Sequence, residues 1–282
     1  MPSTPHHLVT SPGWRDPRVA NLIALALAED VGDGDLTTEA CVAENAQARG
    51  YFLTRESLVL AGTPLLEMLY QEERVELLFP DGSELEAEFV FARVEGSARR
   101  LLTLERTALN LIQRACGVAT LTRRYIEALK GTRCTLLDTR KTTPGMRVIE
   151  KLAVQAGGGT NHRIGLYDAI LIKNNHINAA GGVRQALDGT RATGLPVEIE
   201  VRDFSELDEA LACGARHILL DNFTPKEVAQ AAGVINGRAR IEVSGNLALP
   251  TIRAYAEAGA DFASVGALTH SAPASDISFR FE

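Results

Sequence analysis

Basic side chains gather in one stretch of this chain, residues 138–177. The stretch holds six Lys or Arg residues against three acidic residues, a net charge of +3. The whole chain of 282 residues carries −7, so the remainder carries −10. A short basic stretch that contains three consecutive glycines and two strand-like runs predicts a pocket for a small, multiply charged anion rather than a nucleic-acid surface.

The basic stretch belongs to a series of apolar segments that alternate with helical ones. The segments CTLLD, AILIK, VEIEV, HILLD, RIEVSG and FASVG each have the character of a buried strand, and capped amphipathic helices lie between them. This alternation predicts βα units and a parallel sheet. Polar residues able to do chemistry end or follow these segments, and they include Arg140, Lys141, Lys173, Glu200, Asp221 and Ser244.

The arrangement of the strands decides how closely these residues meet. In a (β/α) barrel the carboxyl ends of all strands converge at one mouth, whereas in an open doubly wound sheet they meet less compactly. About six strands are visible in the sequence, so a complete eight-stranded barrel is not established and both arrangements stay open. In a shared site, cations would suit carboxylates or phosphates, and acids would suit Mg²⁺ or a developing positive charge.

Two acids and one lysine close apolar strands. Glu200 lies in VEIEV and Asp221 ends HILLD, where a buried carboxylate is costly without a cation. Solvated acids at strand ends are the simpler interpretation, but their occurrence in successive strands favours a site role. Lys173 ends AILIK and could form a Schiff base, bind an anion or extend to the surface, and no sequence feature singles out the Schiff base.

Two glycine-containing turns follow the last two visible strands, at Ser244-Gly245-Asn246 and Val265-Gly266-Ala267. Main-chain N–H groups in such turns can hold a phosphate at a barrel mouth. Either turn alone is better explained as an ordinary connection, but the two together make the interpretations about equally good. His162 is an anion-ligand candidate because it adjoins Arg163 and shows no metal-type histidine spacing.

The rest of the chain predicts a second domain and a cellular setting. Residues 47–94 have short β-rich runs that indicate a small mixed α/β domain, and residues 98–129 predict a long helix with Gly117 as a joint. Four widely spaced cysteines suit a reducing compartment. Without a secretory pattern or a membrane-length apolar run, we expect a cytoplasmic protein. Dinucleotide, P-loop and nucleic-acid-stacking motifs are also absent.

Several long motifs, in order along the chain, closely resemble the quinolinate phosphoribosyltransferase family. They are LDTRKTTPG, GGGTNHRIGLYDAILIKNNHI, EIEV, HILLDN, IEVSGN and SVGALTHSAPASDIS, and EDVGDGDLTT and ERTALNLIQRACGVAT are similar as well. The resemblance implies an α/β protein with an N-terminal α/β sandwich and bridging helix over residues 1–117. It also implies a (β/α) barrel with fewer than eight regular strands over 118–270, and a tail strand over 271–282 that returns to the N-terminal domain.

The resemblance implies a reaction and a partner. The phosphoribosyl group of PRPP would be transferred to quinolinate with decarboxylation, giving nicotinate mononucleotide, pyrophosphate and CO₂ in NAD biosynthesis. A homodimer is implied, with higher oligomers left open, in which Arg106 of one subunit enters the barrel mouth of the other. The alternatives are a phosphoribosyltransferase for nicotinate or another aromatic acid, a Schiff-base aldolase using Lys173, and a non-catalytic subunit that binds a phosphometabolite.

The resemblance also carries site roles over, residue by residue. The two carboxylates of quinolinate would be held by Arg106, Thr139, Arg140, His162, Arg163 and Lys173. Lys141 would bind the phosphoribosyl donor and, with Glu200 and Asp221, would take part in catalysis. Those two acids would also hold the Mg²⁺ that binds with PRPP, directly or through water. The 5′-phosphate would be held by Ser244, Gly245, Asn246, Val265, Gly266 and Ala267.

Overall fold

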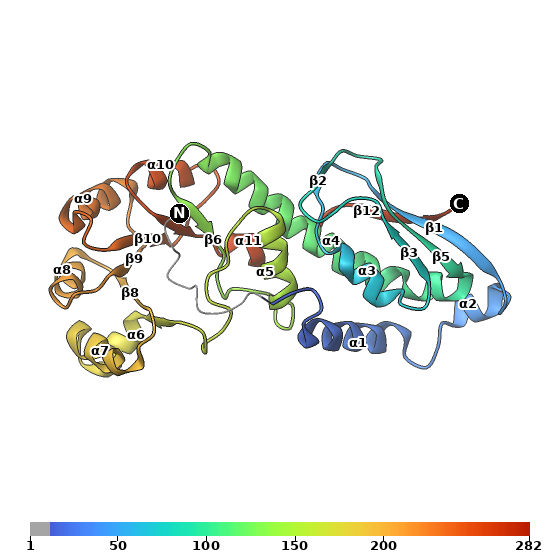
Figure 1. Ribbon diagram of the computed structural model, residues 1–282, viewed down its shortest axis with the longest axis horizontal. Helices are drawn as coiled ribbons and strands as arrows, with labels where there is room; N and C mark the ends of the chain where they lie inside the picture. Colours follow the sequence, from blue (N-terminus) through green and yellow to red (C-terminus); the bar gives the residue numbers. More distant parts are fainter. Residues whose placement is uncertain (1–11) are drawn as a thin grey trace. The chain divides into compact units, whose positions relative to one another are not determined.

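The computed structural model describes residues 12–282, which form two compact units (Figure 1). The sheet unit comprises Pro12–Arg123, Lys141–Gly158 and Ala267–Glu282. The described part of the barrel unit comprises Arg124–Arg140 and Gly159–Gly266. The chain therefore leaves each unit and returns to it, so neither unit is one continuous segment.

The sheet unit is built on a four-stranded antiparallel sheet with the strand order β12-β1-β5-β3. Its strands are β1 (Gln47–Thr54), β3 (Arg74–Leu77), β5 (Val90–Ser97) and β12 (Ile277–Phe281). A second, two-stranded ladder pairs β2 (Leu58–Val59) with β4 (Glu84–Leu85). The helices of this unit are α1 (Pro17–Val31), α2 (Leu36–Cys41), α3 (Thr63–Leu69), most of α4 (Ala98–Leu129), α5 (Arg147–Ala156) and α11 (Ala267–His270).

Aromatic side chains fill the core of the sheet unit. Phe52 on β1 is fully buried, and its ring centroid lies 4.8 Å from that of Phe279 on β12. The ring centroids of Tyr70 and Phe91 lie farther away, at 6.2 and 6.1 Å from that of Phe52. Phe52 and Phe279 are also directly opposed in the β1–β12 ladder, so the last strand of the chain completes the sheet and its core together.

Local signals set the ends of the first helix. Asp16 caps α1 by accepting the main-chain N–H of Arg18, and Pro17 occupies the first helical position, where its missing N–H costs nothing. Both features are helix-start signals that can be read directly in the sequence. Asp35 then caps α2 by accepting the N–H of Thr38.

Gly117 does not act as a joint, because α4 continues through it from Ala98 to Leu129. The need for glycine at this position comes instead from the main chain of Pro273, which lies very close to the helix here. A Cβ atom at this position would lie 1.9 Å from the main-chain oxygen of Pro273. The absence of a side chain at Gly117 therefore lets the segment before β12 lie directly against the helix.

The barrel unit contains six parallel strands in the order β6-β11-β10-β9-β8-β7. They are β6 (Thr135–Leu137), β7 (Ile170–Ile172), β8 (Val197–Val201), β9 (His217–Asp221), β10 (Arg240–Ser244) and β11 (Phe262–Ser264). From β7 to β11 each strand pairs with the next along the chain, and β11 then pairs with β6. This single winding direction is that of a barrel, whereas a doubly wound sheet reverses direction.

The barrel is interrupted between β6 and β7, where a single bridge joins Leu137 to Thr160. The helices of this unit are α6 (Asn174–Ala180), α7 (Val183–Thr190), the 3-10 turn η1 (Arg191–Thr193), α8 (Phe204–Ala212), α9 (Pro225–Ile235) and α10 (Ile252–Glu257). Figure 1 shows α7 to α10 around the outer side of β8–β10. The expected fold class, an α/β barrel with fewer than eight regular strands plus a sheet domain, is confirmed.

Candidate functional site

The carboxyl ends of the six strands bring most of the predicted site residues together in the barrel unit. Thr139 and Arg140 follow β6, Lys173 follows β7, and Glu200 lies one residue before the end of β8. Asp221 ends β9. Ser244 ends β10, and Val265 and Gly266 follow β11. Since parallel strands of one barrel point the same way, these residues share one mouth.

An ion pair links β8 to the residue after β7. The ammonium group of Lys173 donates to Oε2 of Glu200 at 2.6 Å. The Glu200 side chain is 8% exposed, whereas that of Lys173 is 45% exposed. In this ion pair Lys173 serves as a cation, which is the role that binds anions and not the role that attacks a carbonyl. The pair therefore gives the Schiff-base alternative no support.

The turn after β10 is organised by side chains of the neighbouring strand. Ser244 donates its hydroxyl to Oδ1 of Asp221 at 3.0 Å, and the main-chain N–H of Asn222 donates to the Ser244 carbonyl. Gly245 has a φ of +88°, and a Cβ there would lie 2.2 Å from Oδ1 of Asn222. Asn246 follows with a φ of +51°. These two residues with positive φ turn the main chain sharply after β10, and successive N–H groups in such a turn can bind an anion.

The loop that carries His162 and Arg163 is held by two buried acids. Asp138 accepts the main-chain N–H of His162 at 2.8 Å and the side-chain amide of Asn161 at 2.8 Å. Asp168 accepts the main-chain N–H groups of the two residues after Arg163, at 2.6 and 3.0 Å. Both acids are buried, so the loop has little freedom in the folded protein.

Arg163 is a buried cation placed among other charges. Its guanidinium donates to the Ala169 carbonyl at 3.0 Å, and 6% of the residue is exposed. Burial and the nearby charge of Arg140 lower the pKa of Arg163, while the acids Asp168 and Glu198 oppose this shift. The guanidinium groups of Arg140 and Arg163 repel each other, and a bound dianion would offset this repulsion. The arrangement therefore favours a ligand with more than one negative charge.

One layer deeper in the barrel, His162 meets two glutamates. Glu198 lies two residues before Glu200, and Glu242 lies two residues before Ser244, so each points to the same side of its strand as the mouth residue above it. Nε2 of His162 lies 3.1 Å from Glu198 and 3.5 Å from Glu242. Burial raises the pKa of Glu198 to about 8, and the charge of Glu242 adds to this effect.

Three predicted site residues lie in the sheet unit. Arg106 is on α4 and is exposed, Lys141 directly follows Arg140 and is exposed, and Ala267 begins α11. The basic stretch therefore does not act as one patch. Two of its six cations, Arg147 and Lys151, are on α5 in the sheet unit, and Lys151 is fully buried.

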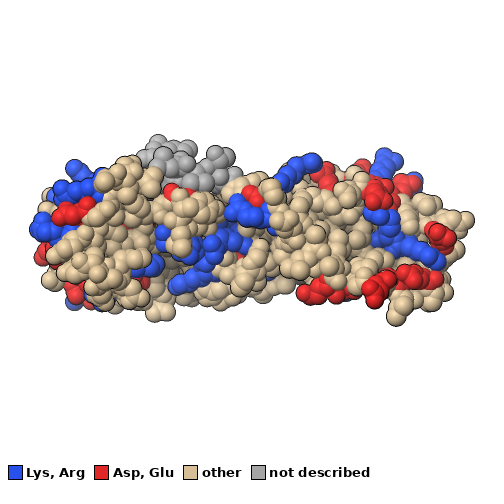
Figure 2. Space-filling view, turned by 90° about the horizontal axis from the view of Figure 1, so that it is seen from below, with Lys and Arg blue, Asp and Glu red and all other residues tan. Residues whose placement is uncertain are grey.

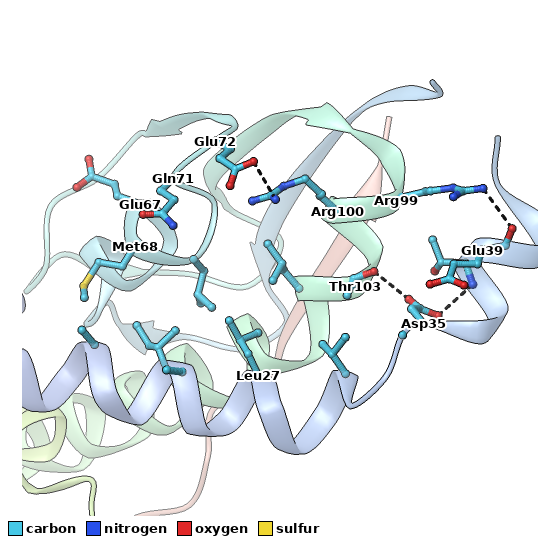
Figure 3. A pocket seen from close by; sticks show the side chains of 18 of the residues that line it. Leu27, Asp35, Glu39, Glu67, Met68, Gln71, Glu72, Arg99, Arg100 and Thr103 are labelled. Carbon is cyan, nitrogen blue, oxygen red and sulfur yellow. Dashed lines mark hydrogen bonds and ion pairs between the residues drawn. The ribbon is translucent and has the colours of Figure 1, made fainter. Parts of the chain in front are cut away.

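A groove in the sheet unit is lined by none of the predicted site residues. It has a volume of about 820 Å³ and is bordered by α1 and α4 (Figure 3). Its polar residues are bound to one another: Arg100 pairs with Glu72 and Glu73 at 2.9 Å each, and Asp35 accepts from Thr103. Figure 2 likewise shows acidic and basic side chains interspersed over the sheet unit. The other two arginines that line the groove, Arg15 and Arg99, bind Glu67 and the Val42 carbonyl in the same unit.

Comparison with known proteins identifies the family. Residues 35–116 match the family model for the quinolinate phosphoribosyl transferase N-terminal domain, and residues 118–280 match that for the C-terminal domain. The chain belongs to the quinolinate phosphoribosyltransferase family. Both family models match separate parts of this one chain, so the relationship covers both halves.

Individual relatives are similar over most of their length. The chain is 38% identical to the tobacco (Nicotiana tabacum) protein named quinolinate phosphoribosyltransferase [decarboxylating] 1b, over 93% of this chain and 81% of the relative. It is 39% identical to a probable nicotinate-nucleotide pyrophosphorylase [carboxylating] of Bacillus subtilis (strain 168), over 89% of each chain. The solved structure of the nicotinate-nucleotide pyrophosphorylase from Francisella tularensis superimposes with a TM-score of 0.90 at 38% identity, covering 94% of this chain and 96% of that one.

Sequence reasoning about this family member missed the deeper layer of the barrel. Glu198 and Glu242 were not among the predicted site residues, yet they surround His162. A signal was present, because each is an acid placed two residues before a mouth residue within an apolar strand. The same spacing applied to β8 and β10 would have placed both acids inside the barrel.

Proposed function

We propose that this protein transfers the phosphoribosyl group of PRPP to quinolinate and releases pyrophosphate and CO₂, forming nicotinate mononucleotide for NAD biosynthesis. The observation that carries the proposal is the set of cations at the strand ends of a chain whose two halves match this family. Arg140, Arg163 and Lys173 come from one barrel mouth. A substrate with two adjacent carboxylates needs more cations than a monocarboxylate such as nicotinate.

The cations would orient the substrate. Guanidinium groups bind carboxylates in a fixed planar geometry, so Arg140 and Arg163 would fix the plane of the pyridine ring. Lys173 would exchange its bond to Glu200 for one to a substrate carboxylate, because its side chain is partly exposed. Thr139 and His162 would complete this side of the site. This orientation would bring the ring nitrogen towards the anomeric carbon of PRPP.

The acids would stabilise positive charge on the ribose. As the bond from the anomeric carbon to pyrophosphate lengthens, the ribose takes on oxocarbenium character, which nearby carboxylates stabilise. Glu200 and Asp221 lie on adjacent strands at the mouth. The bond from the ring nitrogen to the ribose then forms, CO₂ leaves the carbon next to this nitrogen, and a proton replaces it. Lys141 would hold the departing pyrophosphate.

The same two acids fit Mg²⁺, which prefers oxygen ligands and is commonly bound by one or two carboxylates together with substrate phosphates. Each Asp221 oxygen accepts one hydrogen bond, from Ser244 or Asn222, and carboxylate oxygens have capacity for more. When bound, Mg²⁺ would neutralise the leaving pyrophosphate. The left-handed turn Gly245-Asn246, with Ser244, Val265, Gly266 and Ala267, would bind the 5′-phosphate.

The assembly and the compartment are part of the proposal. Arg106 is exposed on α4, as it must be to enter the site of a partner subunit in a homodimer. All four cysteines are free thiols, which suits a reducing compartment, and we propose the cytoplasm. Among the described residues, no helix is both long and apolar enough to cross a membrane.

Product analysis tests this function. The purified chain is incubated with PRPP, Mg²⁺ and either quinolinate or nicotinate, and the products are identified by mass. Nicotinate mononucleotide from quinolinate alone is the expected result. Product from nicotinate and none from quinolinate would contradict the proposal and favour the alternative, a phosphoribosyltransferase for nicotinate.

A further inference from the structure

Two members of the buried group formed by His162, Glu198 and Glu242, namely the two glutamates, have no role in the reaction as proposed above. The exposed fractions of the three residues are 6%, 1% and 0%. Burying two acids beside one histidine is unfavourable unless the charges are compensated. A group retained at such a cost inside the barrel, one layer beneath the mouth, needs an explanation in terms of what it holds in place.

The two nitrogens of the His162 ring have different partners. Nδ1 accepts the main-chain N–H of Arg163 at 2.7 Å, which requires a lone pair on Nδ1. Nε2 faces the carboxylates of Glu198 and Glu242. The ring proton therefore belongs on Nε2, where the glutamates accept it. The second glutamate is itself fixed, because Ser264 donates its hydroxyl to Glu242 at 2.5 Å.

A bound metal ion is a poorer explanation of the same cluster. The three residues do offer ligand atoms within 4.8 Å of one another. A histidine that binds a metal through Nε2 normally carries its proton on Nδ1 and donates it to a neighbour. Here Nδ1 faces a donor, the Arg163 N–H, so a proton on Nδ1 would oppose another N–H group.

The bond from the Arg163 N–H to Nδ1 also bears on whether the His162 ring is neutral or charged. Burial lowers the pKa of His162, but the charges of Glu242 and Glu198 outweigh burial and raise it to about 10. A second proton could be added only at Nδ1, where it would break the bond to Arg163. The two observations oppose each other: the glutamates favour a second proton on the ring, whereas the bond from the Arg163 N–H requires Nδ1 to be free of one. The main-chain geometry of this structure corresponds to the neutral ring with its proton on Nε2.

A second histidine repeats the arrangement at the next cation. Nδ1 of His176 accepts the main-chain N–H of Lys173 at 2.9 Å. Two of the cations proposed to bind quinolinate thus have their main chain fixed by a histidine ring. They differ in setting, since His176 is exposed whereas His162 is buried against the two glutamates.

We propose that Glu198 and Glu242 are positioning residues for the dicarboxylate site: they fix the His162 ring, and the ring fixes the main chain of Arg163. Glu198 is one of the acids that offset the effect of Arg140 on Arg163. Loss of either glutamate should therefore loosen the site for the dicarboxylate and leave the site for PRPP largely intact.

The test compares E198Q and E242Q in the full chain with the native protein. Glutamine keeps the shape of the side chain but can present an N–H group to Nε2. We expect KM for quinolinate to rise about tenfold while KM for PRPP changes less than twofold, as for loss of one buried hydrogen bond to a charged group. E150Q is the matched control, because Glu150 is equally buried but pairs with Arg114 in the sheet unit.

A second readout does not depend on the proposed function, on which the KM comparison rests. In protein labelled with ¹⁵N-histidine, long-range ¹H–¹⁵N spectra show which ring nitrogen carries the proton, and H162N assigns the signal. The native ring should be protonated on Nε2. That signal should shift or broaden in E198Q and E242Q and stay unchanged in E150Q.

Three results would overturn the proposal. One is an unchanged His162 signal in both glutamine variants. Another is an equal rise of KM for both substrates, which would mean general damage to the barrel. The third is a stoichiometric metal ion in the purified protein whose removal by a chelator shifts the His162 signal, since this would make the cluster a metal site.

Discussion

Lys173 and Glu200 form an ion pair at the barrel mouth in which the acid is fixed and the lysine is not. Their Nζ and Oε2 atoms lie 2.6 Å apart, with 8% of the Glu200 side chain exposed against 45% for Lys173. A buried acid cannot easily exchange its partner for water, but a partly exposed lysine can exchange an acid for a substrate anion. The proposed function therefore predicts that a substrate carboxylate replaces Glu200 as the partner of Lys173.

This pairing predicts a large effect of neutralising Glu200. E200Q removes the counter-charge of Lys173 and one of the two carboxylates proposed to stabilise the ribose. We expect kcat/KM for quinolinate to fall about 100-fold, comparable to the loss of one preorganised electrostatic contact. Steady-state assays measure this. E257Q is the control, because it removes an exposed ion pair with Arg253 and should leave activity and stability nearly unchanged.

Asp138 should matter for both stability and substrate affinity. D138N keeps the size of the side chain but weakens the bonds from the His162 N–H and the Asn161 amide, both 2.8 Å long. We expect a loss of about 1–3 kcal/mol in the free energy of unfolding and a higher KM for quinolinate. Denaturant unfolding and substrate titration check the two parts. Full retention of both values would show that the loop does not depend on this acid.

Two glycines in helices should respond oppositely to alanine. In α4, G117A places a Cβ 1.9 Å from the Pro273 oxygen, so we expect destabilisation by about 2 kcal/mol or more. In α9, G233A meets no atom within 4 Å and should stabilise the protein by about 0.5–1 kcal/mol through helix propensity. Thermal unfolding measures the change in stability of each variant relative to the native protein. Equal changes in stability for G117A and G233A would contradict the close contact between Gly117 and the Pro273 main chain.

His217 should make the protein less stable in mild acid. Burial lowers its pKa from 6.5 to about 4, because the ring lies inside the barrel against Phe262. Between pH 6.5 and 4 the unfolded chain binds a proton that the folded chain does not, so stability falls as pH falls through this window, by at most about 3 kcal/mol.

A variant comparison isolates this contribution. H217N should flatten the pH dependence of the unfolding free energy between pH 6.5 and 4. H270N is the control, since His270 is exposed, and it should keep the native slope. If H217N also kept the native slope, the buried ring would not be the source of the acid sensitivity.

Subunit mixing tests the proposed dimer. R106A and K173A should each be inactive alone, because each removes a cation proposed to bind quinolinate. Mixed dimers should regain part of the activity, because one of their two sites would contain both native residues. Activity is measured after the two variants are unfolded and refolded together. Verified mixed dimers that remain inactive would rule out a site shared between subunits.

Much of the fold was predictable because its signals are local. The apolar strands with polar ends, the Asp16-Pro17 helix start and the long helix from Ala98 each depend on residues close in sequence, and each is found. The choice between barrel and open sheet was not predictable from these signals. It depends on the pairing of β11 with β6, which lie more than a hundred residues apart.

The candidate site was predictable at its surface and not beneath it. The mouth residues end strands, so the period of the sheet locates them. The roles of Glu198 and Glu242 depend on the ring of His162, which comes from a loop elsewhere in the chain. Gly117 shows the same limit, since the sequence suggested a joint and only the approach of Pro273 explains the glycine.

The fate of the labelled 2-carboxylate tests the central claim most directly. Quinolinate carrying ¹³C in this carboxylate is supplied with PRPP and Mg²⁺, and labelled CO₂ and nucleotide are measured together. The proposed function predicts one labelled CO₂ for each nicotinate mononucleotide formed, with the nucleotide unlabelled. A nucleotide that retains the label, or turnover of nicotinate without any CO₂ from quinolinate, would contradict it.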